Sequence, residues 1–306
     1  MDIREQLNEK DGWQIWWRLL RPHTLTASFI PVFVGTMLAY IDGHFHLFLF
    51  LAMLIASILI QAATNMFNEY YDYKLGLDTE KSVGIGGTIV RDGVKPETVL
   101  RLGFAFFGIA ILLGVYICFA TSWWIAAIGL VSMLFGYLYT GGPVPIAYTP
   151  FGEVTSGFFM GTVIIGISYF IQTMTITSEV LLISIPIAIL IGAILLSNNI
   201  RDLDGDKKSG RKTIAILLGP KGARYFLASL FVATYVLTAI YIIIGLLPWI
   251  SVITFVTIKM AIDVVKGFQG KTLPIEMMPA MALTGSTNSA YGFLLGISLL
   301  ISTFIN

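Results

Sequence analysis

Two polar clusters interrupt an otherwise apolar chain, and both offer the amide and carboxylate oxygens that hard divalent cations bind. The first cluster, NMFNEYYDYKLGLD, begins at Asn65 and comes at the end of a long apolar stretch. Asn65, Asn68 and Asp72 are spaced i, i+3 and i+7, so they share one face if the helix continues through them. Asp78 follows closely on a glycine, which indicates a turn at the end of that helix.

The second cluster, NNIRDLDGDKKSGRK, has the same order of amides followed by carboxylates. Asn198, Asp202 and Asp206 are spaced i, i+4 and i+8, which predicts a second shared helix face. Arg201 and Lys207 lie among them, and cationic side chains of this kind bind phosphate charge. Together the clusters predict a site at which Mg²⁺ bridges carboxylates to the phosphate oxygens of a substrate.

A simpler interpretation is open for each of these residues, because polar side chains at a helix end often only cap the helix among lipid headgroups. The repeated order of the two clusters favours the metal–diphosphate site. A carboxylate at the centre of a bilayer costs about 2.5–3.5 kcal/mol, and less near the surface, so several retained carboxylates imply a use.

A third polar segment, GYLYTGGPVPIAYTPFGE over residues 136–153, separates the two clusters. Its glycines and prolines predict a break between two helices. Tyr139 and its aromatic neighbours either belong to the interfacial belt or surround a cationic organic intermediate.

The composition predicts the kind of protein that positions these clusters. The chain has 306 residues, of which 56% are hydrophobic and 12% charged, and its mean hydropathy is +0.82. These values are typical of a polytopic membrane protein in the lipid bilayer. The net charge of +1 argues against a nucleic-acid partner, and Cys118, the single cysteine, excludes a disulfide framework and a thiolate metal site.

Nine apolar stretches are each about 20 residues long, which is enough to cross a bilayer. Backbone groups in lipid must be paired internally, so we expect an all-α bundle, with residues 1–306 forming one membrane-embedded domain around a central cavity open to the cytoplasm. The expected spans are 23–41, 46–68, 98–120, 122–139, 151–171, 178–199, 223–245, 248–266 and 281–304.

The distribution of lysine and arginine predicts the orientation. With the N-terminus in the cytoplasm and the C-terminus outside, the outer connections carry no lysine or arginine. Both acidic clusters then lie on the cytoplasmic side, where 69–97 and 200–222 are expected to form long active-site loops. Residues 1–22 carry three tryptophans beside arginines, which predicts an interfacial segment.

The segments NMFNEYYDYKLGLDT, YTGGPVPIAYTPFGE and NNIRDLDGDKKSGRKTIAILLG resemble the motifs of the UbiA superfamily of intramembrane aromatic prenyltransferases. The resemblance covers nearly the whole chain and is strongest to the menaquinone branch, which prenylates 1,4-dihydroxy-2-naphthoate. It implies an enzyme of the bacterial plasma membrane that uses Mg²⁺, a polyprenyl diphosphate donor and this aromatic acceptor, with loss of CO₂ and formation of demethylmenaquinol.

The resemblance also implies roles for individual residues. Glu69 stands where the family usually has Asp, and Gly76 takes the position of a third Asp, for which Asp78 is the expected substitute. The resemblance implies four catalytic residues, which are Asn68, Asp72, Asp202 and Asp206. Together with Asp78 they are the expected metal ligands. The expected substrate-binding residues are Asn65, Asp78, Tyr139, Asn198, Arg201 and Lys207.

Two alternatives remain. The acceptor could be another aromatic compound, such as 4-hydroxybenzoate, or the chain could be an ion-coupled transporter. Transporters usually place their polar site near the middle of the membrane on broken helices, whereas the polar groups here gather at one end of the expected bundle. This placement favours the enzyme.

Overall fold

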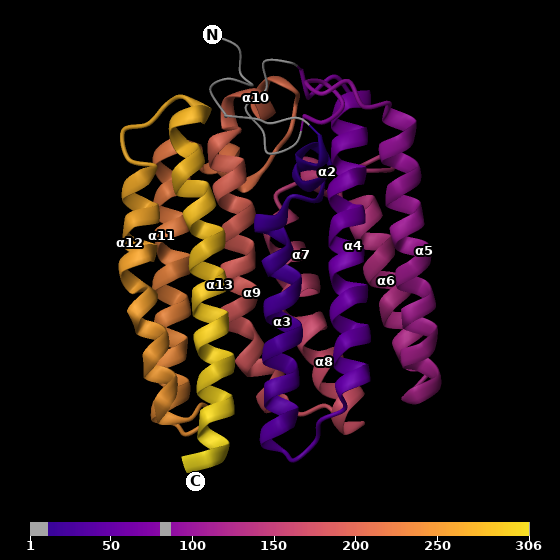
Figure 1. Cartoon of the computed structure of the whole chain (residues 1–306). Helices are drawn as coiled ribbons and strands as arrows, with labels where there is room; N and C mark the ends of the chain where they lie inside the picture. The colour runs from indigo at the N-terminus through magenta and orange to yellow at the C-terminus, as the bar shows by residue number, and fades with distance from the viewer. Residues whose placement is uncertain (1–11, 80–86, 306) are drawn as a thin grey trace.

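The computed structural model describes residues 12–79 and 87–305, and all regular elements in these two ranges are helical (Figure 1). The prediction of an all-α chain is therefore confirmed. The N-terminal half contains α2 (Trp13–Leu20), α3 (Pro22–Ile41), α4 (Leu47–Lys74), α5 (Pro96–Ala120) and α6 (Trp124–Leu138).

The rest of the chain begins with the short η1 (Ile146–Tyr148) and then a continuous rod of α7 (Gly152–Ser156), a π-helical turn η2 (Gly157–Val163) and α8 (Ile164–Thr173). It continues with α9 (Ser178–Arg201), α10 (Leu203–Lys208), α11 (Ile214–Ile243), η3 (Trp249–Thr257), α12 (Ile258–Gly267) and α13 (Pro274–Ile305).

Seven helical segments of the described ranges are long and apolar enough to cross a membrane. Two further expected spans correspond to α6, which is a shorter apolar helix, and to the rod formed by η3 and α12. The chain is thus a multi-pass membrane protein by length and composition, and the count of nine crossings stays a prediction. Proline at the first position of α3 and α5 suits these helix starts, because the N–H that proline lacks has no partner there.

Small residues let α3 pack closely against its neighbours α8 and α13. A methyl group added to Gly35 of α3 would lie 2.5 Å from the carbonyl oxygen of Ile165 in α8. One added to Gly292 of α13 would lie 2.0 Å from the side chain of Ile30 in α3. Such contacts are a usual way for helices to associate in lipid, and they fix α3 in the middle of the bundle (Figure 1).

The polar elements gather at one end of the bundle. Figure 1 shows α2 and α10 at the top, whereas the C-terminal end of α13 lies at the bottom. The expected loop 69–97 begins later than predicted, because α4 runs on to Lys74, and the expected loop 200–222 contains α10 and the first turns of α11.

The prediction that Asn198, Asp202 and Asp206 lie on one continuous helix is wrong. α9 ends at Arg201, Asp202 leaves the helix with φ −93° and ψ 5°, and a separate helix α10 begins at Leu203. The sequence Asp-Leu-Asp-Gly-Asp explains the break, because Asp and Gly are poor helix formers and favour turns and caps.

Candidate active site

A polar cavity of about 110 Å³ lies where the two acidic clusters meet. Residues from both clusters line it together with residues of the segment between them and two residues near the start of α3, so four parts of the chain that are distant in sequence form one site. The lining residues are Arg21, Thr24, Asn68, Asp72, Tyr139, Thr140, Ala147, Leu195, Asn198, Asn199, Arg201, Asp202, Asp206 and Arg211.

The first cluster reaches the cavity because α4 continues past the apolar stretch, as the spacing predicts. Asn68 accepts a hydrogen bond from the Thr140 hydroxyl at 2.7 Å, which fixes the orientation of its amide. Gly76 has a φ of 70°, a conformation that glycine adopts easily, and the chain turns back there. The N–H of Asp78 then donates to the Asp72 carbonyl at 3.3 Å, so Asp78 returns to the vicinity of Asp72.

Two arginines neutralise the carboxylates of the cavity. Arg211 donates from Nη2 to Asp72 at 2.8 Å and from Nη1 to Asp206 at 3.0 Å, so it joins the first cluster to the second. Its guanidinium also lies 5.1 Å from the ring of Tyr148, within the range of a cation–π contact. Arg201 holds Asp202 with two hydrogen bonds of 2.7 and 2.5 Å.

Burial disfavours the ionised form of the carboxylates that lie outside the membrane-spanning segments. Burial raises the pKa of Asp78 to about 6 and that of Asp206 to about 6, in both cases as the largest effect, and neighbouring carboxylates add to it. Oδ2 of Asp206 is buried and has no hydrogen-bond partner among the residues that the structure describes. A buried oxygen without a partner is unfavourable, so this atom is suited to a cation.

Within the described ranges, no group of three or more His, Cys, Asp or Glu side chains is close enough to hold a metal ion unaided. The arrangement explains this, because Arg211 and Arg201 lie among the carboxylates that would otherwise approach one another. The donors present nevertheless fit Mg²⁺, which takes one or two carboxylates together with waters and substrate phosphate oxygens.

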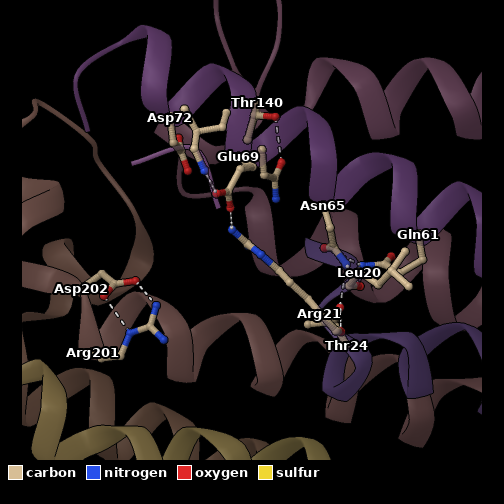
Figure 2. A network of polar contacts seen from close by, with 12 residues as sticks. Leu20, Arg21, Thr24, Gln61, Asn65, Glu69, Asp72, Thr140, Arg201 and Asp202 are labelled. Carbon is tan, nitrogen blue, oxygen red and sulfur yellow. Dashed lines mark hydrogen bonds and ion pairs between the residues drawn. The ribbon is translucent and has the colours of Figure 1, made fainter. Parts of the chain in front are cut away.

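The corner between α2 and α3 contributes Arg21 and Thr24 to the lining of the cavity, and Figure 2 shows its contacts with α4. The Asn65 amide donates to the Leu20 carbonyl and to the Thr24 hydroxyl, each at 2.9 Å. The Arg21 side chain extends from this corner to Glu69, with 3.5 Å between Nη2 and Oε2. Asn65 thus holds the corner in place, and Arg21 brings a positive charge to the edge of the cavity.

A second, apolar cavity of about 460 Å³ adjoins the polar one and is lined by α3, α4, α5, α6, η2 and α9. Its lining includes Val115 of α5 and Leu130 of α6, whose side chains are exposed rather than packed in the core. We call the residues that line both cavities the shared rim; they are Arg21, Thr24, Asn68, Tyr139, Leu195 and Asn198. The two cavities together suit an amphiphile with a charged head and an apolar tail.

Comparison with known proteins identifies the family. The model of the UbiA prenyltransferase family matches residues 28–270. The chain is 59% identical over 292 residues to the 1,4-dihydroxy-2-naphthoate octaprenyltransferase of Bacillus subtilis (strain 168), over 95% of this chain and 94% of the relative. The chain belongs to the UbiA prenyltransferase family. This UbiA family membership confirms the resemblance seen in the motifs and favours an enzyme over a transporter.

Solved structures share the fold of this UbiA family member. A UbiA homolog from Archaeoglobus fulgidus bound to GPP and Mg²⁺ has a TM-score of 0.66 at 18% identity, over 92% of this chain and 99% of that one. The apo structure of a UbiA homolog from Aeropyrum pernix K1 has a TM-score of 0.69 at 17% identity, over 91% of this chain and 97% of that one.

Not all predicted site residues of this UbiA chain lie at the polar cavity. Asn65 lines only the apolar cavity, Asp78 lies beside Asp72, and Lys207 is exposed and lines neither cavity. The predicted residues that do line the polar cavity are Asn68, Asp72, Tyr139, Asn198, Arg201, Asp202 and Asp206.

Two residues that the sequence analysis did not select complete the site. Arg211 lies in the second cluster, but its sequence position alone does not distinguish it from the neighbouring lysines. Arg21 looked like part of an interfacial segment, and only the corner between α2 and α3 turns it towards the cavity.

Proposed function

We propose that this protein transfers a polyprenyl group from polyprenyl diphosphate to 1,4-dihydroxy-2-naphthoate, with loss of CO₂ and formation of demethylmenaquinol. The observation that carries the proposal is the pairing of a charged cavity with an apolar one across the shared rim. The 59% identity to a dihydroxynaphthoate octaprenyltransferase supports the choice of acceptor.

Mg²⁺ is the proposed cofactor, and its proposed ligands are Asn68, Asp72, Asp78, Asp202 and Asp206. When bound, it neutralises the diphosphate and makes it a better leaving group. The buried and unpaired Oδ2 of Asp206 supports this assignment, as do the raised pKa values of Asp78 and Asp206, because a cation relieves the cost of burying a carboxylate.

The protein's own residues bind and orient the donor. Arg201 and Arg211 bring positive charge to the polar cavity, where guanidinium groups can donate to diphosphate oxygens as its bond to the prenyl carbon breaks. The apolar cavity receives the tail and keeps water from the allylic cation. The electron-rich ring attacks this cation at carbon, and the Tyr139 ring at the shared rim is placed to stabilise the positive charge.

The proposed orientation in the membrane depends on the end of the bundle at which the polar cavity lies. We propose that the polar cavity faces the cytoplasm of a bacterial cell, with the N-terminus inside and the C-terminus outside. The lysines and arginines of residues 201–224 support this, because basic loops stay on the cytoplasmic side of a membrane.

The test is turnover by the purified full-length protein in detergent or proteoliposomes. We expect Mg²⁺-dependent release of pyrophosphate, with formation of the prenylated quinol, from octaprenyl diphosphate and 1,4-dihydroxy-2-naphthoate. A parallel reaction with 4-hydroxybenzoate tests the choice of acceptor. Turnover with 4-hydroxybenzoate alone would replace the acceptor, and no turnover with any aromatic acceptor would overturn the enzyme assignment.

A further inference from the structure

Glu69 belongs to the first acidic cluster but is not among the residues that line the polar cavity. Its side chain is only 2% exposed, and Glu69 lines neither the polar nor the apolar cavity. Its Oε1 accepts a hydrogen bond from the backbone N–H of Ile89 at 3.2 Å, and its Oε2 lies 3.5 Å from Nη2 of Arg21. Both oxygens of this carboxylate therefore contact groups other than the expected metal ligands.

Arg21 occupies an unusual backbone conformation. Its φ of 52° and ψ of 63° place it in the left-handed region, which non-glycine residues rarely adopt. The conformation ends α2 and starts α3, and the Arg21 N–H donates to the Arg18 carbonyl at 2.9 Å. Such a conformation persists only when the surrounding contacts determine it, which indicates a functional role for the corner between α2 and α3.

The Arg21 side chain lies at the boundary between the two cavities. It is part of the shared rim, and within residues 12–79 and 87–305 its buried Nε has no hydrogen-bond partner. A buried guanidinium donor beside a charged cavity is suited to an anionic oxygen of a ligand. Glu69 is the carboxylate to which this guanidinium is paired in the structure.

Contacts that do not involve Glu69 also hold the corner between α2 and α3. The role of Glu69 can therefore be distinguished from that of the residues that only hold the corner. Asn65 binds the Leu20 carbonyl of α2, and Arg18 of α2 donates to Asp92 at 2.7 Å. These two contacts position α2 without touching the Arg21 side chain. Among the described residues, Glu69 accepts a hydrogen bond from the Arg21 guanidinium and another from the backbone N–H of Ile89, in the segment that leads into α5.

We propose that Glu69 is a positioning residue, which holds the Arg21 guanidinium at the shared rim to bind an anionic group of a substrate. This rests on the proposed function. The group is either the diphosphate of the prenyl donor or the carboxylate of the aromatic acceptor. Glu69 is therefore not a ligand of the metal, although it stands in the acidic motif.

The first experiment compares Glu69→Gln with the wild type. The amide retains an acceptor for the Ile89 N–H but loses the charge that faces Arg21. We expect KM for one substrate to rise about tenfold, with kcat changed less than about threefold and an unchanged Mg²⁺ concentration for half-maximal rate. A rise for the donor identifies the diphosphate, and a rise for the acceptor identifies the carboxylate. A shift in the Mg²⁺ requirement, or an unchanged KM for both, would overturn the proposal.

A double-mutant cycle tests whether Glu69 acts through Arg21. We expect Arg21→Gln to raise the same KM, and Arg21→Gln with Glu69→Gln to raise it no further, because coupled residues are not additive. Additive effects would contradict the proposal. Arg21→Gln is also informative by itself if Glu69→Gln does not fold, since an unchanged KM in Arg21→Gln would sink the idea.

Asp92→Asn is the matched control, because the Asp92 carboxylate is a second buried acidic group, 1% exposed, and it accepts a hydrogen bond from Arg18 of α2. We expect this variant to lower the melting temperature while leaving both KM values within about twofold of the wild type. A KM rise equal to that of Glu69→Gln would assign Glu69 a merely structural role. Absence of turnover in the wild type would instead refute the proposed function itself.

Discussion

Replacing Arg211 by alanine should separate an effect on the stability of the fold from an effect on turnover, two effects that a conventional active-site mutation combines. Arg211 makes two charge-assisted hydrogen bonds, to Asp72 at 2.8 Å and to Asp206 at 3.0 Å. The side chains involved are 13%, 20% and 11% exposed, so solvent screens these bonds only partly. Without Arg211, two carboxylates remain facing each other with less compensation.

The expected loss in the free energy of unfolding can be worked out from these contacts. A hydrogen bond to a charged group contributes about 1.5–3 kcal/mol, and removal of one partner of a buried ion pair costs about 3–5 kcal/mol. The residual exposure places the expected loss near the lower end, at about 3 kcal/mol in the free energy of unfolding. We therefore expect a melting temperature several degrees below that of the wild type in a buffer without divalent cations.

Mg²⁺ should reverse this loss. The ion would neutralise the same carboxylates that Arg211 neutralises, so it should raise the melting temperature of Arg211→Ala more than that of the wild type. Turnover should nevertheless fall at least about tenfold, because the diphosphate loses a guanidinium partner. The variant would thus gain more stability from the metal and yet be a poorer catalyst.

Thermal unfolding over a series of Mg²⁺ concentrations, together with initial rates of pyrophosphate release, measures both quantities. Arg224→Ala is the matched control, since Arg224 is a half-buried arginine that bonds the Phe268 carbonyl and lines neither cavity. Equal stabilisation of Arg211→Ala and the wild type by Mg²⁺ would refute the reasoning, as would unchanged turnover.

Three further predictions concern the polar and apolar cavities. Asp202→Ala should reduce turnover at least about a hundredfold while the protein stays folded, and activity close to the wild type would remove Asp202 from the proposed metal site. Lys207→Ala should change KM and kcat less than about twofold, because Lys207 is exposed; a tenfold loss in kcat/KM would restore it as a phosphate ligand. Gly114→Phe should fill part of the apolar cavity and lower kcat/KM for octaprenyl diphosphate more than for geranyl diphosphate. Gly108→Phe, on the same helix but outside the cavity, should leave that ratio unchanged, and equal effects of both substitutions would contradict this view of the tail.

The helical framework could be predicted from the sequence because apolar stretches of this length must pair their backbone groups internally. The face shared by Asn65, Asn68 and Asp72 could also be predicted, since it depends only on helical periodicity. The spacing of Asn198, Asp202 and Asp206 suits a helix, so the break after Arg201 was not predicted. The low helix propensity of the Asp and Gly residues overrides this spacing.

The arginines of the site could not be selected from the sequence. Which cation of the second cluster faces the cavity depends on the turn after α10, where the Lys212 N–H donates to the Tyr148 carbonyl at 2.9 Å. That bond joins segments more than sixty positions apart, and no local pattern reports it. The position of Glu69 likewise depends on Ile89 and on the left-handed corner at Arg21.

The shared rim has a consequence for the fate of the two products. The bond that breaks would lie at the rim, so pyrophosphate forms in the polar cavity and the prenylated quinol forms with its tail in the apolar one. One product can then leave for water and the other for lipid without passing each other. Neither product therefore has to wait for the other to leave.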